Sequence, residues 1–180
     1  LENGIQMVMS INRLEPTIKL QRNSQVLLDL KSFAPEGTVI KFDPNRGWAA
    51  SKGLLIIGRF EGVNAIPDYL HECGHLKDPS SMRLASDTMS NYTEHYFNKD
   101  PNDRSPQRLQ ALYERHIAVI GAERDAWAFA LKTIRKLEKQ FGINIIQRMG
   151  GVKGTLRYVN SYVHQYEQKT RTELEYLGLR

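Results

Sequence analysis

The sequence predicts a mainly helical α+β fold with one small β-sheet, built as a single domain over residues 1–180. Three observations support this prediction. Two short runs rich in β-branched residues lie between residues 38 and 60, which is typical of strands. Apolar residues recur with a helical period over residues 105–141, and a second helical segment occupies residues 152–180.

The composition is that of an ordinary globular protein, with 41% hydrophobic and 25% charged residues. The longest apolar run, Leu54–Ile57, is far too short to cross a bilayer, so we expect no membrane partner. The single cysteine, Cys73, cannot form a disulfide within the chain. Low cysteine usage favours a reducing, cytoplasmic compartment.

The first part of the chain predicts one helix and two strands. Residues 25–33 place apolar side chains at helical spacing, and Pro35 and Gly37 end the pattern. Residues 38–42 alternate and are β-branched, and residues 54–60 form a second short apolar run. We expect these two runs to be strands of one sheet, with residues 54–60 at the edge that lines a cleft.

The middle of the chain predicts a helix followed by a long polar connection. Pro67 and Asp68 suit the first turn of a helix, because proline fixes φ and the carboxylate complements the helix dipole. This helix should continue through His75. Residues 77–104 are polar and show no sustained period, which predicts a long loop or insertion with a short element at residues 92–97.

The C-terminal part predicts two helices. Ser105 is a good cap, Pro106 fits the first turn, and Gly142 supplies a stop after the long helix. The last helix, over residues 152–180, carries tyrosines four residues apart, which favours a packed amphipathic face with solvated hydroxyls over a platform that stacks bases: Tyr158, Tyr162 and Tyr166.

A metal-binding pentapeptide, HExxH, stands on the helix that begins near Pro67. Its spacing puts His71 and His75 on one helical face, where both imidazoles can bind one zinc ion. Glu72 can then activate a water molecule held by the metal and act as general acid and base. With five His and 12 Glu in the chain, about 0.01 such motifs are expected by chance.

The third ligand of a catalytic zinc must come from further along the chain. The long helix has one inward-facing stripe with Glu123 at its middle, formed by Leu109, Tyr113, His116, Ile120, Glu123, Trp127, Ala130, Ile134, Leu137 and Phe141. A buried carboxylate is costly unless it is paired or binds a metal. We therefore predict that Glu123 is the third ligand; the alternatives are a salt bridge to a buried Lys or Arg and a carboxylate at an opening in the core.

Other candidate residues receive weaker roles. His95 is the alternative ligand if the polar connection folds over the site. His116 lies about 10 Å from Glu123 along the helix axis, which suits a core or supporting histidine; the alternative is an electrophilic role near the substrate. Cys73 points away from the two motif histidines and is expected to be a buried structural thiol.

The run Glu123-Arg124-Asp125-Ala126-Trp127-Ala128-Phe129-Ala130, which follows His-Glu-Cys-Gly-His, resembles the ImmA/IrrE-type zinc metallopeptidases. The resemblance implies a zincin-like, gluzincin-like fold with His71, His75 and Glu123 as zinc ligands. It also implies an intracellular endopeptidase, often one that cleaves a transcriptional repressor. Trp127 occupies the position of an aspartate found in thermolysin-type enzymes, so any carboxylate that orients a ligand histidine must come from elsewhere.

These observations predict a zinc metallopeptidase that hydrolyses a protein or peptide substrate. A rival hypothesis is a catalytically silent module with the same fold that binds a protein or nucleic acid, and a third is a metal-dependent hydrolase of another substrate. The net charge of +5 allows an anionic partner. Because Lys and Arg are scattered between acids, an ordinary solvated surface is favoured over a dedicated nucleic-acid site.

Overall fold

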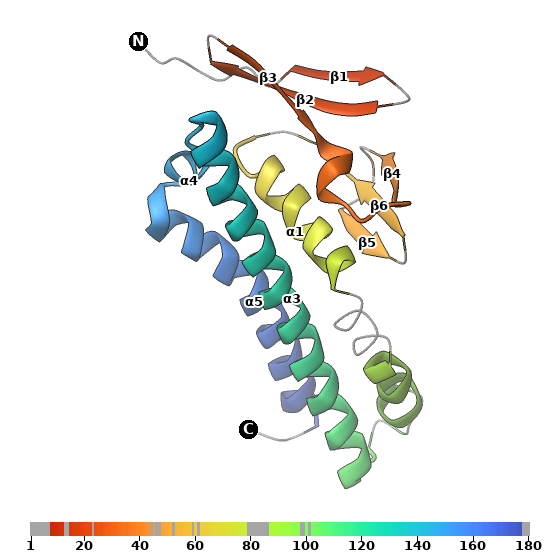
Figure 1. Ribbon diagram of the computed structural model, residues 1–180. Helices are drawn as coiled ribbons and strands as arrows, with labels where there is room; N and C mark the ends of the chain where they lie inside the picture. The colour runs from red at the N-terminus through yellow and green to blue at the C-terminus, as the bar shows by residue number, and fades with distance from the viewer. Residues whose placement is uncertain are drawn as a thin grey trace.

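The computed structural model confirms an α+β fold that is mainly helical (Figure 1). It describes the whole chain except residues 1–7, 13–14, 23, 44, 46–47, 52, 59, 61, 79–86, 98–99, 101 and 178–180. Two three-stranded sheets precede the helices in the described part of the chain, where one small sheet was expected.

The N-terminal sheet corrects the prediction of an early helix. Strands β1 (Val8–Asn12), β2 (Glu15–Arg22) and β3 (Ser24–Asp29) form an antiparallel meander, and one 3-10 turn, η1 (Leu30–Phe33), follows. The predicted helix over residues 25–33 is therefore wrong. A short apolar run fits either period, and here pairing of β3 with β2 decides the outcome.

The second sheet contains both predicted strands but in a different arrangement. It consists of β4 (Val39–Phe42), β5 (Ala49–Ser51) and β6 (Leu54–Ile57) in the order β4-β6-β5. Strand β6 pairs with β4 in parallel and with β5 antiparallel, so it is central, and the expectation that it forms the edge is wrong. A strand made only of Leu and Ile is typical of such a buried position.

Helix α1 (Ala65–Lys77) crosses helix α3 (Pro106–Phe141) at close range. The approach depends on Gly74, because a Cβ atom there would lie 2.6 Å from the backbone oxygen of Ala126. The main core fills the space between these helices and the second sheet, with Leu55, Tyr69 and Trp127 almost fully buried. The helix predicted through His75 is confirmed, and it meets the long helix next to Glu123.

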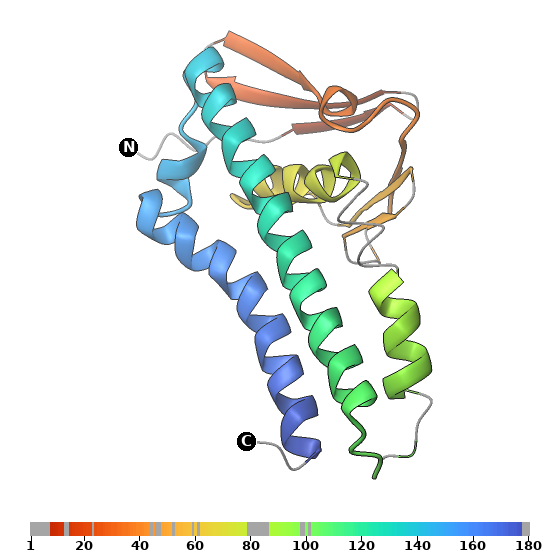
Figure 2. The same ribbon diagram turned by 60° about the horizontal axis from the view of Figure 1, so that its bottom comes forward.

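The two long helices lie side by side in both views (Figures 1 and 2). The Ser105 side chain accepts a hydrogen bond from the Arg108 amide at the start of α3, and Gly142 ends it with a left-handed φ of 64°. Helix α4 (Ile145–Arg148) makes the turn, and α5 (Gly151–Tyr176) runs back along α3. These boundaries agree with the sequence, although Tyr113 of the predicted inward stripe is 60% exposed.

The polar connection is more ordered than expected. Residues 87–92 are helical and continue into a π-helical turn, η2 (Thr93–Phe97), while residues 79–86 lie outside the described part. Tyr92 and Tyr96 stack at 4.7 Å and pack on Leu112 and Leu177. The short element predicted at residues 92–97 is therefore confirmed. The loop prediction is wrong for residues 87–91, because partners on α3 and α5 supply burial that the local sequence does not reveal.

Candidate metal centre

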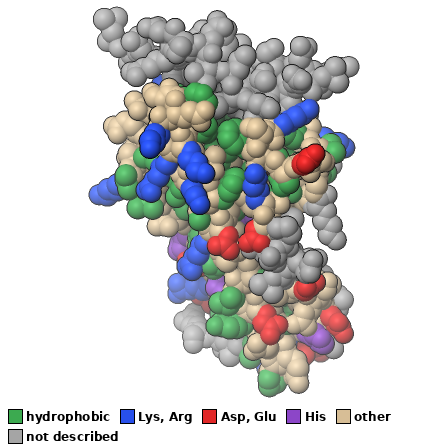
Figure 3. All heavy atoms as spheres, viewed as in Figure 1, with side chains coloured by type: hydrophobic (Ala, Val, Ile, Leu, Met, Phe, Trp, Pro, Cys, Tyr) green, Lys and Arg blue, Asp and Glu red, His purple; other side chains and the backbone are tan. Residues whose placement is uncertain are grey.

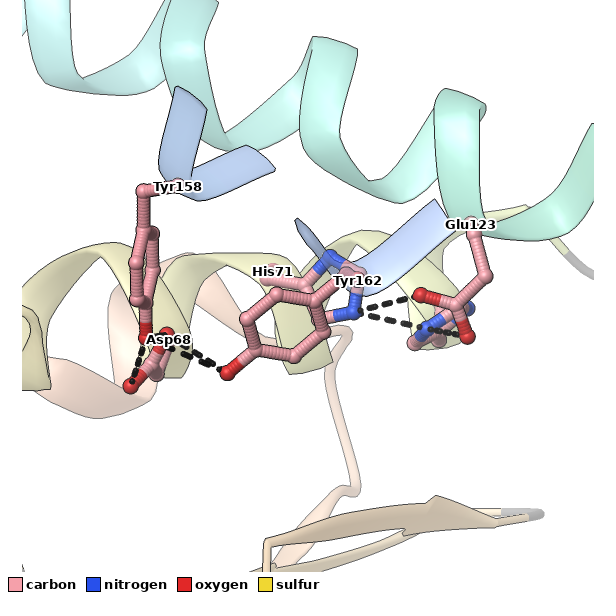
Figure 4. Close-up of polar contacts among 6 residues, drawn as sticks. Asp68, His71, Glu123, Tyr158 and Tyr162 are labelled. Carbon is pink, nitrogen blue, oxygen red and sulfur yellow. Dashed lines mark hydrogen bonds and ion pairs between the residues drawn. The ribbon is translucent and has the colours of Figure 1, made fainter. Parts of the chain in front are cut away.

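Three of the predicted site residues converge where α1 crosses α3. His71 Nε2 lies 3.1 Å from His75 Nε2 and 3.1 Å from Glu123 Oε2 (Figure 4). His75 Nε2 lies 3.6 Å from Glu123 Oε1. One ligand atom from each residue can be chosen so that all lie within 4.8 Å of one another, so the cluster could hold a metal ion.

The spacing of these atoms fits a small tetrahedral ion. With metal–ligand bonds of about 2.0–2.1 Å, two ligand atoms on a tetrahedral zinc lie about 3.3 Å apart. The shortest separations, 3.1–3.6 Å, are close to this value, although they involve both carboxylate oxygens of Glu123. Two neutral imidazoles and one carboxylate also form a ligand set that zinc enzymes use.

Burial increases the need for a cation at Glu123, which is only 7% exposed. Its Oε2 atom contacts His71 but has no hydrogen bond of good geometry among the described residues. The ion-pair partners of its carboxylate in the described part of the chain are the two histidines, and no Lys or Arg there lies within ion-pair distance. The alternative of a buried salt bridge to Lys or Arg therefore finds no support in the described residues.

The electrostatics favour the ligating forms of His75 and Glu123. Burial, together with the neighbouring His71, lowers the pKa of His75, so its imidazole is neutral. Burial alone would raise the pKa of Glu123, but the close contact with His71 and the positive charge that either histidine carries when protonated outweigh it and lower that pKa. A neutral imidazole and an ionised carboxylate are the forms that bind metals.

Glu72 lies beside His71 on α1 and is half-buried. Burial raises the pKa of Glu72 to about 7, the charge of His71 opposes this rise, and the charges of Glu123 and Asp68 add to it. A carboxyl group with such a pKa can take up and release a proton near neutral pH. Glu72 follows His71 directly in the sequence, and its carboxyl group is near enough to His71 and Glu123 for their charges to act on its pKa.

Aromatic rings hold His71 in place. The Trp127 ring stacks on the His71 ring at 4.4 Å and 29°, and the Tyr162 ring lies 5.5 Å away. His71 Nδ1 is buried and has no hydrogen-bond partner among the described residues. Ring packing therefore orients this imidazole in the described structure. In many zinc sites, by contrast, a carboxylate or carbonyl accepts a hydrogen bond from the second ring nitrogen of the histidine.

The tyrosines of α5 bind carboxylates of the site. Tyr158 donates a hydrogen bond of 2.8 Å to Asp68 Oδ1, and Tyr162 donates one of 3.2 Å to the same atom (Figure 4). The Tyr166 hydroxyl lies near the Glu123 carboxylate, and burial together with the charge of Glu123 raises the pKa of Tyr166 to about 12. The packed amphipathic face is confirmed. The expectation of solvated hydroxyls is wrong for Tyr158 and Tyr162, because their hydroxyls donate hydrogen bonds to Asp68.

Sequence reasoning did not assign Trp127 or Tyr166 to the site. The four-residue spacing of the tyrosines showed that they share a face but not which surface this face contacts. Trp127, four residues after Glu123, belongs to the predicted inward-facing stripe and takes the place of the thermolysin-type aspartate, but neither observation predicts a contact with His71. Its stacking on His71 depends on the crossing of α1 and α3, which no local pattern encodes.

The remaining candidate residues lie apart from the cluster. His95 is in η2 and its nearest acidic partner is Glu94, at 3.8 Å. His116 Nδ1 forms a 2.8 Å hydrogen bond with Thr170 Oγ1, in line with a packed supporting histidine. Cys73 is fully buried in the core, and burial raises the pKa of its thiol to about 12, which agrees with a structural role.

Comparison of the chain with protein-family models, with curated proteins and with solved structures finds no match. The helices in the described part of the chain include none that is both long and apolar enough to cross a membrane. The geometry of the site and the motifs in the sequence therefore indicate the function.

Proposed function

We propose that the protein is a zinc-dependent metallopeptidase with a zincin-like fold. The observation that carries the proposal is the convergence of His71, His75 and Glu123 from two helices, with Glu72 directly after His71 on α1. A structural zinc site normally has four protein ligands, whereas a catalytic site has three and keeps one position for water or substrate. The resemblance of both motifs to the ImmA/IrrE-type peptidases supports the same hypothesis.

Each residue then has a chemical task. His71, His75 and Glu123 would hold the ion, which supplies polarisation of the scissile carbonyl and a lower pKa for a water molecule. Glu72 takes a proton from the attacking water at its carboxylate and passes it to the leaving amine. Trp127 and Tyr166 keep His71 and Glu123 in the orientation that ligation requires.

The second sheet offers a surface for an extended peptide. Strand β5 is an edge of this sheet and packs near α1, and its residues Ala49 and Ser51 are exposed. A substrate strand could pair with this edge and bring its backbone towards the helix that carries Glu72. This replaces the earlier expectation that β6 forms the edge.

The proposal is tested by hydrolysis of fluorescein-labelled casein with zinc-loaded protein and with the Glu72→Gln variant. We expect cleavage by the wild type and at least a roughly 100-fold lower rate for Glu72→Gln, because a positioned general base contributes about that factor or more. Elemental mass spectrometry must show that the variant retains its zinc.

Two outcomes would contradict the peptidase proposal. If the zinc-loaded wild type cleaves neither casein nor a library of unstructured peptides, the hypothesis of a non-catalytic module is favoured. Hydrolysis of p-nitrophenyl acetate in a Glu72-dependent manner, without peptide cleavage, would favour a hydrolase of another class.

A further inference from the structure

The positive charge of the chain is concentrated in one segment. Residues 132–157 contain seven Lys or Arg residues and one acidic residue, Glu138, which gives a net charge of +6. The whole chain has a net charge of +5, so the rest of the chain carries −1. The alternation of basic and acidic residues seen elsewhere therefore does not hold in this segment.

The fold gathers this segment into one corner, formed by the end of α3, by α4 and by the start of α5. Lys132, Arg135, Lys136 and Lys139 have the spacing of one face of α3. Figure 3 shows Lys and Arg side chains gathered over this corner. We call the following set the basic corner, and all its members are exposed: Lys132, Arg135, Lys136, Lys139, Arg148, Lys153 and Arg157.

The charges of the basic corner are not neutralised by neighbours in the described structure. Among the described residues, no ion pair involves any of its seven members. The single carboxylate of the segment is engaged with the backbone, since Glu138 Oε1 accepts a 2.7 Å hydrogen bond from the Ile146 amide. Seven exposed cations in one place form a strong positive potential that attracts a polyanion.

Its other exposed side chains indicate which polyanion fits. Three amides, Gln140, Asn144 and Gln147, lie between the cations and can hydrogen-bond phosphates, sugars or base edges. The exposed large hydrophobic residues of the corner are Val152 and Leu156, both on α5. Insertion into a membrane interface requires a broad apolar face, whereas contact with a phosphate backbone requires spaced cations and polar groups.

We propose that the basic corner binds the phosphate backbone of nucleic acid. Its nearest cation on α3, Lys132, lies nine residues beyond Glu123, about 14 Å along the helix axis. Binding therefore needs neither zinc nor Glu72, and the corner would hold the protein at nucleic acid whatever reaction the metal centre performs.

Fluorescence anisotropy with a labelled 20-base-pair duplex DNA of arbitrary sequence tests this proposal. For Arg135→Ala/Lys139→Ala we expect the slope of log K against log salt to fall by about 2, because each lost phosphate contact removes about 0.9. The same relation predicts that this double variant binds the duplex roughly 50-fold more weakly than wild type at 0.1 M salt. The matched control, Lys41→Ala/Lys169→Ala, loses the same charge from exposed sites elsewhere and should bind within about twofold of wild type.

Three results would overturn the proposal. The first is no binding by wild type at 50 mM salt, and the second is equal loss of binding in both double variants. The third is binding to vesicles that contain phosphatidylserine without binding to the duplex, which would identify an anionic membrane as the partner. Circular dichroism should show that both variants are folded, and EDTA should leave duplex binding unchanged.

Discussion

Two regions along α3 each contain a buried or partly buried carboxylate, and the two carboxylates have different kinds of partner. At the crossing with α1, Glu123 contacts the imidazoles of His71 and His75 and lies near the Tyr166 hydroxyl. Near the start of α3, Glu173 of α5 lies 3.8 Å from Arg115 and accepts a 3.1 Å hydrogen bond from Tyr92. Among the described residues, therefore, Glu173 has a permanently charged partner, Arg115, whereas Glu123 has none.

The second region is a structural cluster. The Arg115 guanidinium also lies over the Tyr92 ring at 4.4 Å, and Arg108 lies over Tyr96 at 4.7 Å while donating to backbone oxygens of Asp100 and Asp103. These contacts attach the segment that contains Tyr92 and Tyr96 to α3 and α5. The comparison teaches that the groups around a buried carboxylate, and not its burial alone, distinguish a metal ligand from a structural ion pair.

The largest effect should come from removing the metal. Wild type in zinc at about 1,000 times its Kd should be about 4 kcal/mol more stable to urea than in EDTA, because the ion binds only the folded state. Glu123→Ala should lose this difference, whereas Glu173→Ala should keep it. Equal dependence on zinc in both variants would remove the distinction between the two regions.

A smaller effect is expected from removing the cation of the second region. Arg115→Ala leaves the partly buried Glu173 carboxylate without its guanidinium and should destabilise the protein by about 2–3 kcal/mol, with no change in zinc content. Arg171→Ala, which breaks an exposed pair with Glu175, should change stability by less than about 0.5 kcal/mol. Urea unfolding measures both; loss of zinc in Arg115→Ala would show that the regions are coupled.

The crossing of α1 and α3 can be tested with two glycines. Gly74→Ala places a Cβ against the backbone of Ala126 and should destabilise the protein by about 1–3 kcal/mol and weaken zinc binding. Gly121→Ala, on α3 with open space around its Cβ, should stabilise it by about 0.5–1 kcal/mol. Thermal unfolding compares them, and a neutral Gly74→Ala would contradict the close packing.

The smallest effect concerns Asp68, where burial raises the pKa above its ordinary value of 3.8 although hydrogen bonds from Tyr158 and Tyr162 oppose the rise. The fold thus favours the protonated acid, and the stability from this group is present below about pH 3.8 and lost as pH rises through its folded pKa. Asp68→Asn cannot ionise. In EDTA, lowering the pH from 7 to 4 should therefore shift stability in favour of wild type relative to this variant, and the opposite shift would refute the assignment.

The site was more predictable from sequence than the sheets. The positions of His71, His75 and Glu123 follow from helical periodicity, because each lies on a helix with clear start and stop residues. Residues 25–29 form a strand and β6 is central, since strand pairing depends on contacts distant in sequence. The same reason explains why Trp127 and Tyr166 were missed: their roles exist only after α1, α3 and α5 have packed.

The central claim, that the cluster binds zinc, is tested most directly by elemental mass spectrometry on purified protein. The account predicts one zinc per chain in wild type and in Glu72→Gln, and loss of zinc in His71→Ala and Glu123→Ala. Glu173→Ala, from the structural cluster, should keep its zinc. Wild type without zinc after growth in zinc-supplemented medium, or Glu123→Ala with a full complement, would contradict the account.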